Sequence, residues 1–140
     1  MKNTLLFVLD TNQFLIAAAA PPDNSCLLLI DKIISLFPAI KVCIPQTIFK
    51  EVRKNLHPRL FTHFIKLLRK IGTVEEDSLI PFELVLQYEN IGLKPADAFI
   101  AAFCEWIEAT ALVSENRHFL SRQINLPFKV LTASQCLRTL

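Results

Sequence analysis

The chain has 140 residues and a formal net charge of +2. This length suits one domain with one core, and we expect residues 1–140 to form it. An apolar fraction of 52% and a charged fraction of 20% exclude an intrinsically disordered chain. The two glycines, Gly72 and Gly92, are too few for a glycine-rich phosphate loop or for an all-β sandwich with many tight turns.

Short apolar runs alternate along the chain with segments of helical periodicity. Strands are predicted, in chain order, at residues 4–9, 39–44, 73–75, 111–114 and 128–131. Helices are predicted between and after them, at residues 12–20, 24–37, 45–56, 60–71, 82–91, 94–109 and 133–137. Strands that alternate with helices indicate a parallel sheet covered on both faces.

Prolines and caps set several of these helix boundaries. Asn24 or Ser25 can cap the helix that precedes the second strand. Pro45 suits the first turn of the helix that follows that strand, and Pro95 suits the first turn of the helix 94–109. The apolar stripe from Phe61 to Leu68 either packs in the core or covers a partner subunit.

Asp10 ends the first predicted strand, and ligands of open parallel sheets gather at the carboxyl ends of strands. The alternative role for Asp10 is to cap the next helix. Thr11 and Asn12 could provide that cap instead, which would leave Asp10 without an obvious structural task.

Two further acids follow the same pattern. Glu51 lies in the helix after the second strand, where its alternative role is a surface contact with Lys50 or Lys54. Asp97 lies in the first turn of the helix 94–109, where the helix dipole alone would favour an acid. Together with Asp10, these carboxylates supply the oxygen ligands that Mg²⁺ or Mn²⁺ needs for hydrolysis of a phosphodiester.

Polar residues 114–118 follow the fourth predicted strand and offer a hydroxyl, a carboxylate, an amide, a guanidinium and an imidazole. The alternative for this segment is an ordinary polar surface loop. A second source of charge is the segment 50–70, where Glu51 is the one acid among lysines and arginines. Such a basic field could attract a polyanion, or it could be a solvated helix face.

Four segments resemble the PIN-domain family, and in particular its VapC-like toxins of toxin–antitoxin pairs. They are Val-Leu-Asp-Thr-Asn at 8–12, Ile-Pro-Gln-Thr-Ile-Phe-Lys-Glu-Val at 44–52, Pro-Ala-Asp-Ala-Phe-Ile-Ala-Ala at 95–102 and Leu-Val-Ser-Glu-Asn-Arg-His-Phe-Leu at 112–120. The segments span most of the chain and occur in the family's order. The resemblance implies an α/β/α sandwich with a central parallel sheet and a metal-dependent ribonuclease site.

The resemblance assigns roles to individual residues. Asp10, Glu51 and Asp97 match the family's first three acids. The resemblance implies that Asp10 and Asp97 bind Mg²⁺ or Mn²⁺ directly. It implies that Glu51 either binds the ion or orients the attacking water. The fourth acid of the family is replaced by Asn116, which is expected to be a weak ligand or to act through a water.

Neighbouring residues complete the expected site. Ser114 stands where the family has threonine, and Ser114 and Thr11 would organise the backbone or hold water. Glu115 could replace the missing fourth acid if the loop turns it inward. Basic side chains are expected to contact the RNA phosphates: Arg53, Lys54, Arg117 and His118.

The unpaired cysteines and the short apolar runs indicate a cytoplasmic protein with no membrane segment. The family resemblance also implies a homodimer with a cognate antitoxin as partner. The sequence leaves other functions open. A PIN-like chain can be an inactive module that binds nucleic acid or protein, or a nuclease of RNA processing outside toxin–antitoxin pairs. An aspartyl phosphatase is disfavoured, because that chemistry usually shows a second Asp where Asn12 stands.

Overall fold

The structure is a computed structural model that describes residues 4–19, 21–121 and 125–140. In these residues a five-stranded parallel sheet has the order β3-β2-β1-β4-β5. The strands are β1 (Leu5–Leu9), β2 (Ile40–Pro45), β3 (Gly72–Glu75), β4 (Ala111–Val113) and β5 (Lys129–Leu131). Each predicted strand is therefore present, with ends that differ by at most one residue.

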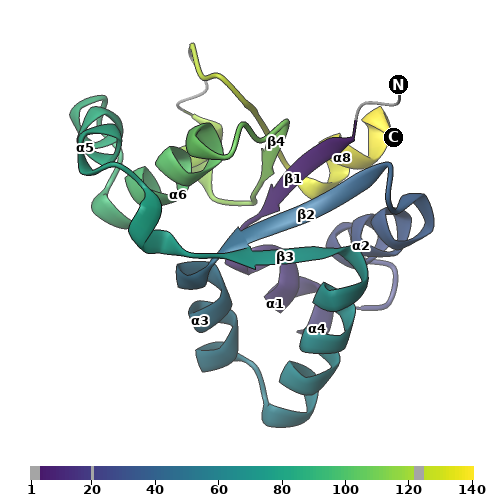
Figure 1. The fold of residues 1–140 in the computed structure, drawn as a ribbon. Coiled ribbons are helices and arrows are strands. Elements are labelled where there is room, and N and C mark those ends of the chain that lie inside the picture. The colour runs from purple at the N-terminus through teal and green to yellow at the C-terminus, as the bar shows by residue number, and fades with distance from the viewer. Residues whose placement is uncertain (1–3, 20, 122–124) are drawn as a thin grey trace.

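Helices cover both faces of the sheet. They are α1 (Thr11–Ala19), α2 (Ser25–Leu36), α3 (Gln46–Asn55), α4 (Pro58–Ile71), α5 (Phe82–Asn90), α6 (Pro95–Trp106), α7 (Arg117–Leu120) and α8 (Ala133–Thr139), with a 3₁₀ helix, η1 (Asp77–Leu79). Helices α1, α3 and α4 lie below the sheet in Figure 1, and α6 lies above it against α5. The expected α/β/α sandwich is confirmed.

The central strands form the middle of the core because they are almost wholly apolar. Val8, Leu9, Ile44 and Leu112 are fully buried. Burial on both faces is what a continuous apolar run predicts for a parallel strand. On α4, Phe64 and Leu68 are buried as well, so this stripe packs in the core at those positions.

Local contacts define three helix boundaries more closely than the sequence does. The predicted helix 94–109 ends at Trp106, because Glu108 adopts a left-handed backbone conformation with φ 57° and the Ala109 N–H donates to the Cys104 carbonyl at 2.9 Å. Pro45 belongs to the end of β2 and precedes the first turn of α3. Asn24 is the cap of α2, and its Oδ1 accepts from the Leu27 N–H at 2.9 Å.

Strand β3 begins at Gly72 because the chain runs very close to β2 there. A Cβ at this position would lie 1.7 Å from the carbonyl oxygen of Val42. Only a residue without a side chain fits, so the β2–β3 pairing depends on this glycine.

The strand order creates a reversal point beside β1. From β1 the chain continues to β2 and β3 on one side, and after β3 it crosses to β4 and β5 on the other side. Ligands of open α/β sheets bind at such a point, outside the carboxyl ends of the strands. Among the described residues, no helix has both the length and the apolar character to cross a membrane.

Candidate active site

Asp10 lies at the carboxyl end of β1, directly at the reversal point. It is 6% exposed, and its backbone N–H donates to the Val113 carbonyl of the neighbouring strand at 2.9 Å. Its Oδ1 accepts from the Thr11 N–H at 2.8 Å, and its Oδ2 accepts from Ser114 Oγ at 2.7 Å. The expectation that Asp10 has no structural task is wrong, because this carboxylate binds the first backbone N–H of α1 and joins β1 to the end of β4.

The environment of Asp10 favours its protonated form. Burial is the largest cause of its raised pKa, and the hydrogen bonds from Ser114 and Thr11 oppose that effect. The negative charges of Asp97 and Glu51 raise the pKa of Asp10 further. The structure therefore brings Asp97 and Glu51 within electrostatic reach of Asp10.

Asp97 and Glu51 approach Asp10 from two different helices. Asp97 is half-buried in the first turn of α6, which begins at Pro95, and Glu51 is exposed in the middle of α3. The backbone carbonyl of Glu51 accepts from Asn55 Nδ2 at 2.8 Å, within the same helix. The side-chain charge of Glu51 acts on Asp10, whose pKa it raises.

Asn116 connects α6 to α7. Its Nδ2 donates to Asp97 Oδ1 at 3.3 Å, and its Oδ1 accepts from the His118 N–H at 3.0 Å. Asn116 is thus the cap of α7, which occupies part of the segment that could have been a surface loop. Both ends of this amide are engaged, and its N–H₂ end faces the carboxylate of Asp97.

Glu115 is turned inward, but toward residues other than the acids. Its Oε2 accepts from Gln13 Nε2 at 2.7 Å and from the Ala133 N–H at 3.0 Å, at the start of α8. Gln13 is fully buried, and sequence reasoning missed it. The one available signal was an amide directly after Asp10-Thr11-Asn12 in an otherwise apolar helix.

The other predicted residues surround these acids. Thr11 is half-buried at the start of α1, and Ser114 is fully buried after β4. The predicted phosphate-binding residues are exposed at the ends of α3 and α7: Arg53, Lys54, Arg117 and His118.

The donor set suits a hard divalent cation only in part. Mg²⁺ and Mn²⁺ prefer oxygen ligands such as carboxylates. A cation would also offset the repulsion between Asp10 and the neighbouring acids. Yet no three His, Cys, Asp or Glu side chains in residues 4–19, 21–121 and 125–140 stand close enough to hold one ion. Asp10 and Asp97 are the residues that could hold such an ion, whereas the Asn116 amide presents its N–H₂ group to Asp97 and uses its oxygen to cap α7.

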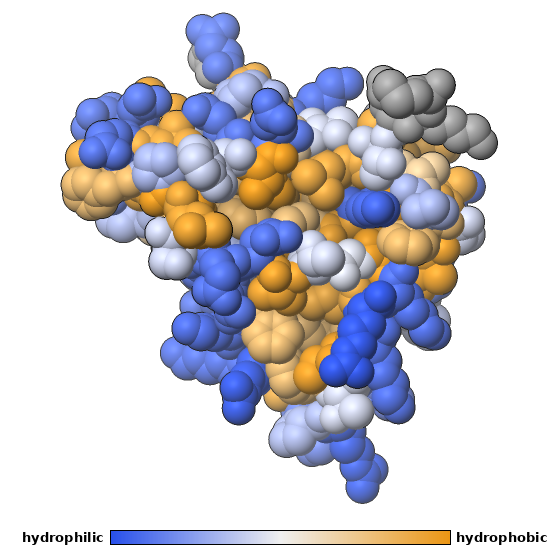
Figure 2. All heavy atoms as spheres, viewed as in Figure 1, coloured by the Kyte–Doolittle hydropathy of each residue, from blue (hydrophilic) through white to orange (hydrophobic). Residues whose placement is uncertain are grey.

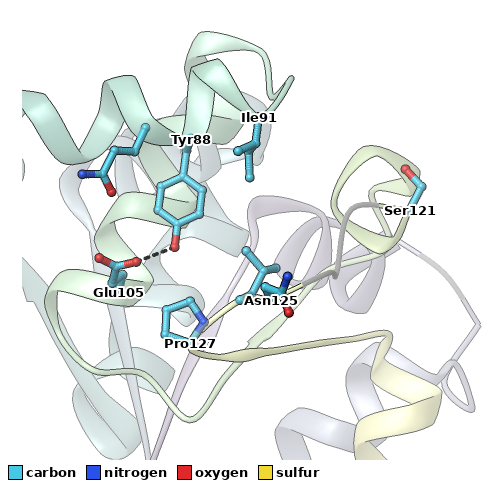
Figure 3. A pocket seen from close by; sticks show the side chains of 8 residues that line it. Tyr88, Ile91, Glu105, Ser121, Asn125 and Pro127 are labelled. Atoms are coloured by element: carbon cyan, nitrogen blue, oxygen red, sulfur yellow. Dashed lines mark hydrogen bonds between the residues drawn. The ribbon is translucent and has the colours of Figure 1, made fainter.

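A cavity of about 520 Å³ lies elsewhere on the molecule, between α5, α6 and the segment before β5. In Figure 3 the Tyr88 hydroxyl points at Glu105, to which it donates at 2.8 Å, and Pro127 lies below this pair. The predicted acids do not line it. Glu105 is roughly two turns along α6 from Asp97, so this cavity is separate from the candidate active site.

No protein-family model and no curated protein matches the sequence. Solved structures do match the fold. One match is VapBC2 from Rickettsia felis, in a structure bound to a DNA fragment from the VapBC2 promoter. It has a TM-score of 0.63 at 17% identity, and covers 91% of this chain and 98% of that chain. The chain has a PIN-like fold.

Two further structures agree. A toxin–antitoxin complex from Klebsiella pneumoniae has a TM-score of 0.64 at 18% identity, and covers 93% of this chain and 98% of that chain. FitAcB from Neisseria gonorrhoeae has a TM-score of 0.58 at 16% identity, and covers 91% of this chain and 98% of that chain. The resemblance drawn from the sequence segments is confirmed for the PIN-like fold, and the function rests on the residues within it.

Proposed function

We propose that this PIN-like chain is a metal-dependent endoribonuclease and the toxin of a toxin–antitoxin pair. One observation carries the catalytic part of the proposal. Asp10 is held at the reversal point of the sheet, where burial raises its pKa most and the charges of Asp97 and Glu51 add to that rise. Clustered acids with a perturbed pKa are typical of functional sites.

Asp10 and Asp97 would hold Mg²⁺ or Mn²⁺. Such an ion activates water and stabilises the negative charge that develops on a phosphoryl group. Ser114 fixes the orientation of Asp10, and Asn116 fixes that of Asp97. Glu51 is exposed and carries a charge near both acids, so it is suited to orient water or to complete the ligand set.

The surface that we propose binds the RNA substrate carries basic side chains. Hydrophilic side chains line α3 and α4 in Figure 2, and on α3 they include the exposed Lys50, Arg53 and Lys54. Arg117 and His118 are exposed on α7, next to Asn116. Contacts from such side chains to phosphates position a nucleic acid without reading its sequence.

Cleavage of a structured RNA pool tests the proposal directly. We expect the purified protein to cut RNA with Mg²⁺ or Mn²⁺ and to lose this activity with EDTA. Asp97→Asn should abolish cleavage, whereas Asp31→Asn, the same change at an exposed position of α2, should leave it intact. Retained cleavage in Asp97→Asn would refute the site.

A second candidate function is an inactive binding module. The observation that favours it is that the described residues contain no group of three acids close enough to share an ion. If the wild type is inert with both metals but binds RNA or a small co-purifying protein, this function replaces the nuclease. A nuclease of RNA processing would instead cleave RNA without any antitoxin partner.

An apolar groove between α1, α2 and α4 is the surface that suits an antitoxin. The groove encloses about 270 Å³, and its lining includes Leu27, Leu60 and Phe64. Arg59 and Lys66 are exposed on α4, beside the groove. An amphipathic helix with an acidic edge would match this surface in both shape and charge.

Co-expression with the small protein encoded beside this chain tests the partner. The two should co-purify, and Leu60→Glu in the groove should abolish the complex. Trp106→Glu, at a residue that is 50% exposed on α6 outside the groove, is the matched control and should preserve it. Equal binding by both variants would place the partner on another surface.

The homodimer is also a proposal. Leu79, Phe82 and Leu86 are large apolar residues that stay exposed near the start of α5 and on its surface, and a second copy could cover them. Analytical ultracentrifugation should show a dimer, and Phe82→Glu should shift it toward the monomer. A wild type that sediments as a monomer at all concentrations would exclude this assembly.

A further inference from the structure

Hydrogen bonds connect the start of α8 to α1 through Glu115. The Oε2 atom of Glu115 accepts from the Ala133 N–H at 3.0 Å and from Gln13 Nε2 at 2.7 Å. Gln13 Nε2 also donates to Asn12 Oδ1 at 3.2 Å, and the Glu115 N–H donates to that same oxygen at 3.3 Å. Glu115 and Gln13 therefore hold Asn12 from two sides.

The connection continues from Asn12 to the candidate active site. Asn12 Nδ2 donates to Ser114 Oγ at 3.4 Å, and Ser114 Oγ donates to Asp10 Oδ2 at 2.7 Å. Ser114 Oγ also accepts from the Asn116 N–H at 3.0 Å. The hydroxyl of Ser114 thus has its partners fixed on both sides, and it can present its proton to Asp10.

The orientation of the Gln13 side-chain amide leaves its oxygen without a hydrogen bond among the described residues. The residue is fully buried, and its Oε1 is a buried atom without a hydrogen-bond partner among the described residues. A buried carbonyl oxygen without a donor destabilises the fold. The opposite orientation would place Oε1 against two acceptor oxygens, Glu115 Oε2 and Asn12 Oδ1, so the two bonds made by Nε2 fix this amide.

We propose that Glu115 and Gln13 are positioning residues for Asp10, which they act on through Asn12 and Ser114. The inference rests on the proposed nuclease function. It gives Glu115 a role different from the missing fourth acid, because its Oε2 is engaged by Gln13 and Ala133. A shift of the Ser114 hydroxyl would leave the Asp10 carboxylate with only the hydrogen bond from the Thr11 N–H among the hydrogen bonds described, and small misplacements of catalytic groups lower rates strongly.

Helix α8 provides the matched control, because it carries its own cap. Thr132 Oγ1 accepts from the Gln135 N–H at 3.1 Å, and Gln135 Oε1 accepts from the Thr132 N–H at 2.9 Å. Gln135→Ala removes half of this capping box without touching the connection to Asp10. It loosens the same helix end that Glu115→Ala loosens, so it reports the purely structural effect.

The experiment compares steady-state RNA cleavage by Glu115→Ala, Glu115→Gln and Gln135→Ala, with melting temperatures for each. Glu115→Ala should lower kcat by about tenfold or more with little change in KM. Glu115→Gln retains an oxygen that can accept from Gln13 and Ala133, so it should recover most of the rate. Gln135→Ala should lower the melting temperature but keep kcat. An equal loss of kcat in Glu115→Ala and Gln135→Ala would overturn the proposal.

A second measurement does not depend on cleavage. The side-chain amide signals of Asn12 in a ¹H–¹⁵N NMR spectrum of the whole protein should move in Glu115→Ala and stay in place in Gln135→Ala. Unmoved signals in Glu115→Ala would also overturn the proposal. If the wild type cleaves no RNA, the nuclease function fails, and these signals alone decide whether Glu115 and Gln13 hold this edge of the sheet.

Discussion

Asp10→Asn should remove activity and at the same time stabilise the metal-free fold at neutral pH. The wild-type carboxyl is 6% exposed, and burial together with the charges of Asp97 and Glu51 raises its pKa. In the unfolded chain the same carboxyl is solvated and has its ordinary pKa. The substitution replaces a group that resists ionisation with a neutral side chain of the same shape.

The raised pKa of Asp10 determines how the stability of the wild type changes with pH. A carboxyl whose pKa is higher in the folded state binds its proton more tightly there, so its contribution to stability is largest below the unfolded pKa. That contribution is lost as the pH rises through the folded pKa. Each tenfold difference in proton affinity between the two states corresponds to about 1.4 kcal/mol. Asp10→Asn avoids this loss, so we expect it to gain stability relative to the wild type as the pH rises.

The loss of a hydrogen bond opposes this gain. The amide has a single oxygen, so Asp10→Asn loses the hydrogen bond from either Thr11 or Ser114, which offsets about 1 kcal/mol. These hydrogen bonds favour the ionised carboxylate, and their effect is already part of the net raised pKa of Asp10. The difference between two pH values therefore reports the net effect of burial, neighbouring charges and hydrogen bonds.

Urea unfolding in EDTA, followed by circular dichroism at about pH 4 and about pH 7, measures that difference. Relative to the wild type, Asp10→Asn should have a larger free energy of unfolding, and therefore a more stable fold, at the higher pH than at the lower pH. The exposed Asp31→Asn should show little change between the two conditions. A relative stability of Asp10→Asn that is the same at both pH values, or that falls as the pH rises, would refute the reasoning.

Three further predictions concern stability and reactivity. Gly72→Ala should destabilise the protein by about 3 kcal/mol or more in thermal unfolding, because the new Cβ would lie 1.7 Å from the Val42 carbonyl oxygen. Asp77→Ala should lower the free energy of unfolding by about 1–2 kcal/mol, because Asp77 Oδ2 accepts from the Thr47 N–H and hydroxyl in the first turn of α3. The native thiols should react with iodoacetamide only after unfolding, because all four are buried. Burial raises the pKa of Cys26, Cys43 and Cys136 to about 11, and it raises the pKa of Cys104 well above its usual range.

The sheet and its main helices follow from local patterns in the sequence. Apolar runs such as Leu5–Leu9 predict buried strands, and the prolines and caps predict most helix starts. Two short elements, η1 and α7, were not predicted. Their positions depend on side chains that meet them, since Asp77 binds Thr47, which lies 30 residues earlier, and Asn116 caps α7 while it binds Asp97.

The acids of the candidate site could be predicted for a similar reason. Asp10 and Asp97 stand at a strand end and a helix start, and parallel strands bring such positions to one edge of the sheet. Gln13 could not be predicted, because its role depends on Glu115, which lies 102 residues away. No periodic pattern or cap in the sequence marks a contact of that separation.

Asn116 shows how this chain differs from one with a fourth acid. An aspartate at that position would add a negative charge beside Asp97 and would need a cation to offset it. The amide instead donates from Nδ2 to Asp97 Oδ1, and its oxygen caps α7. Asn116 therefore keeps Asp97 oriented without adding to the negative charge around Asp10.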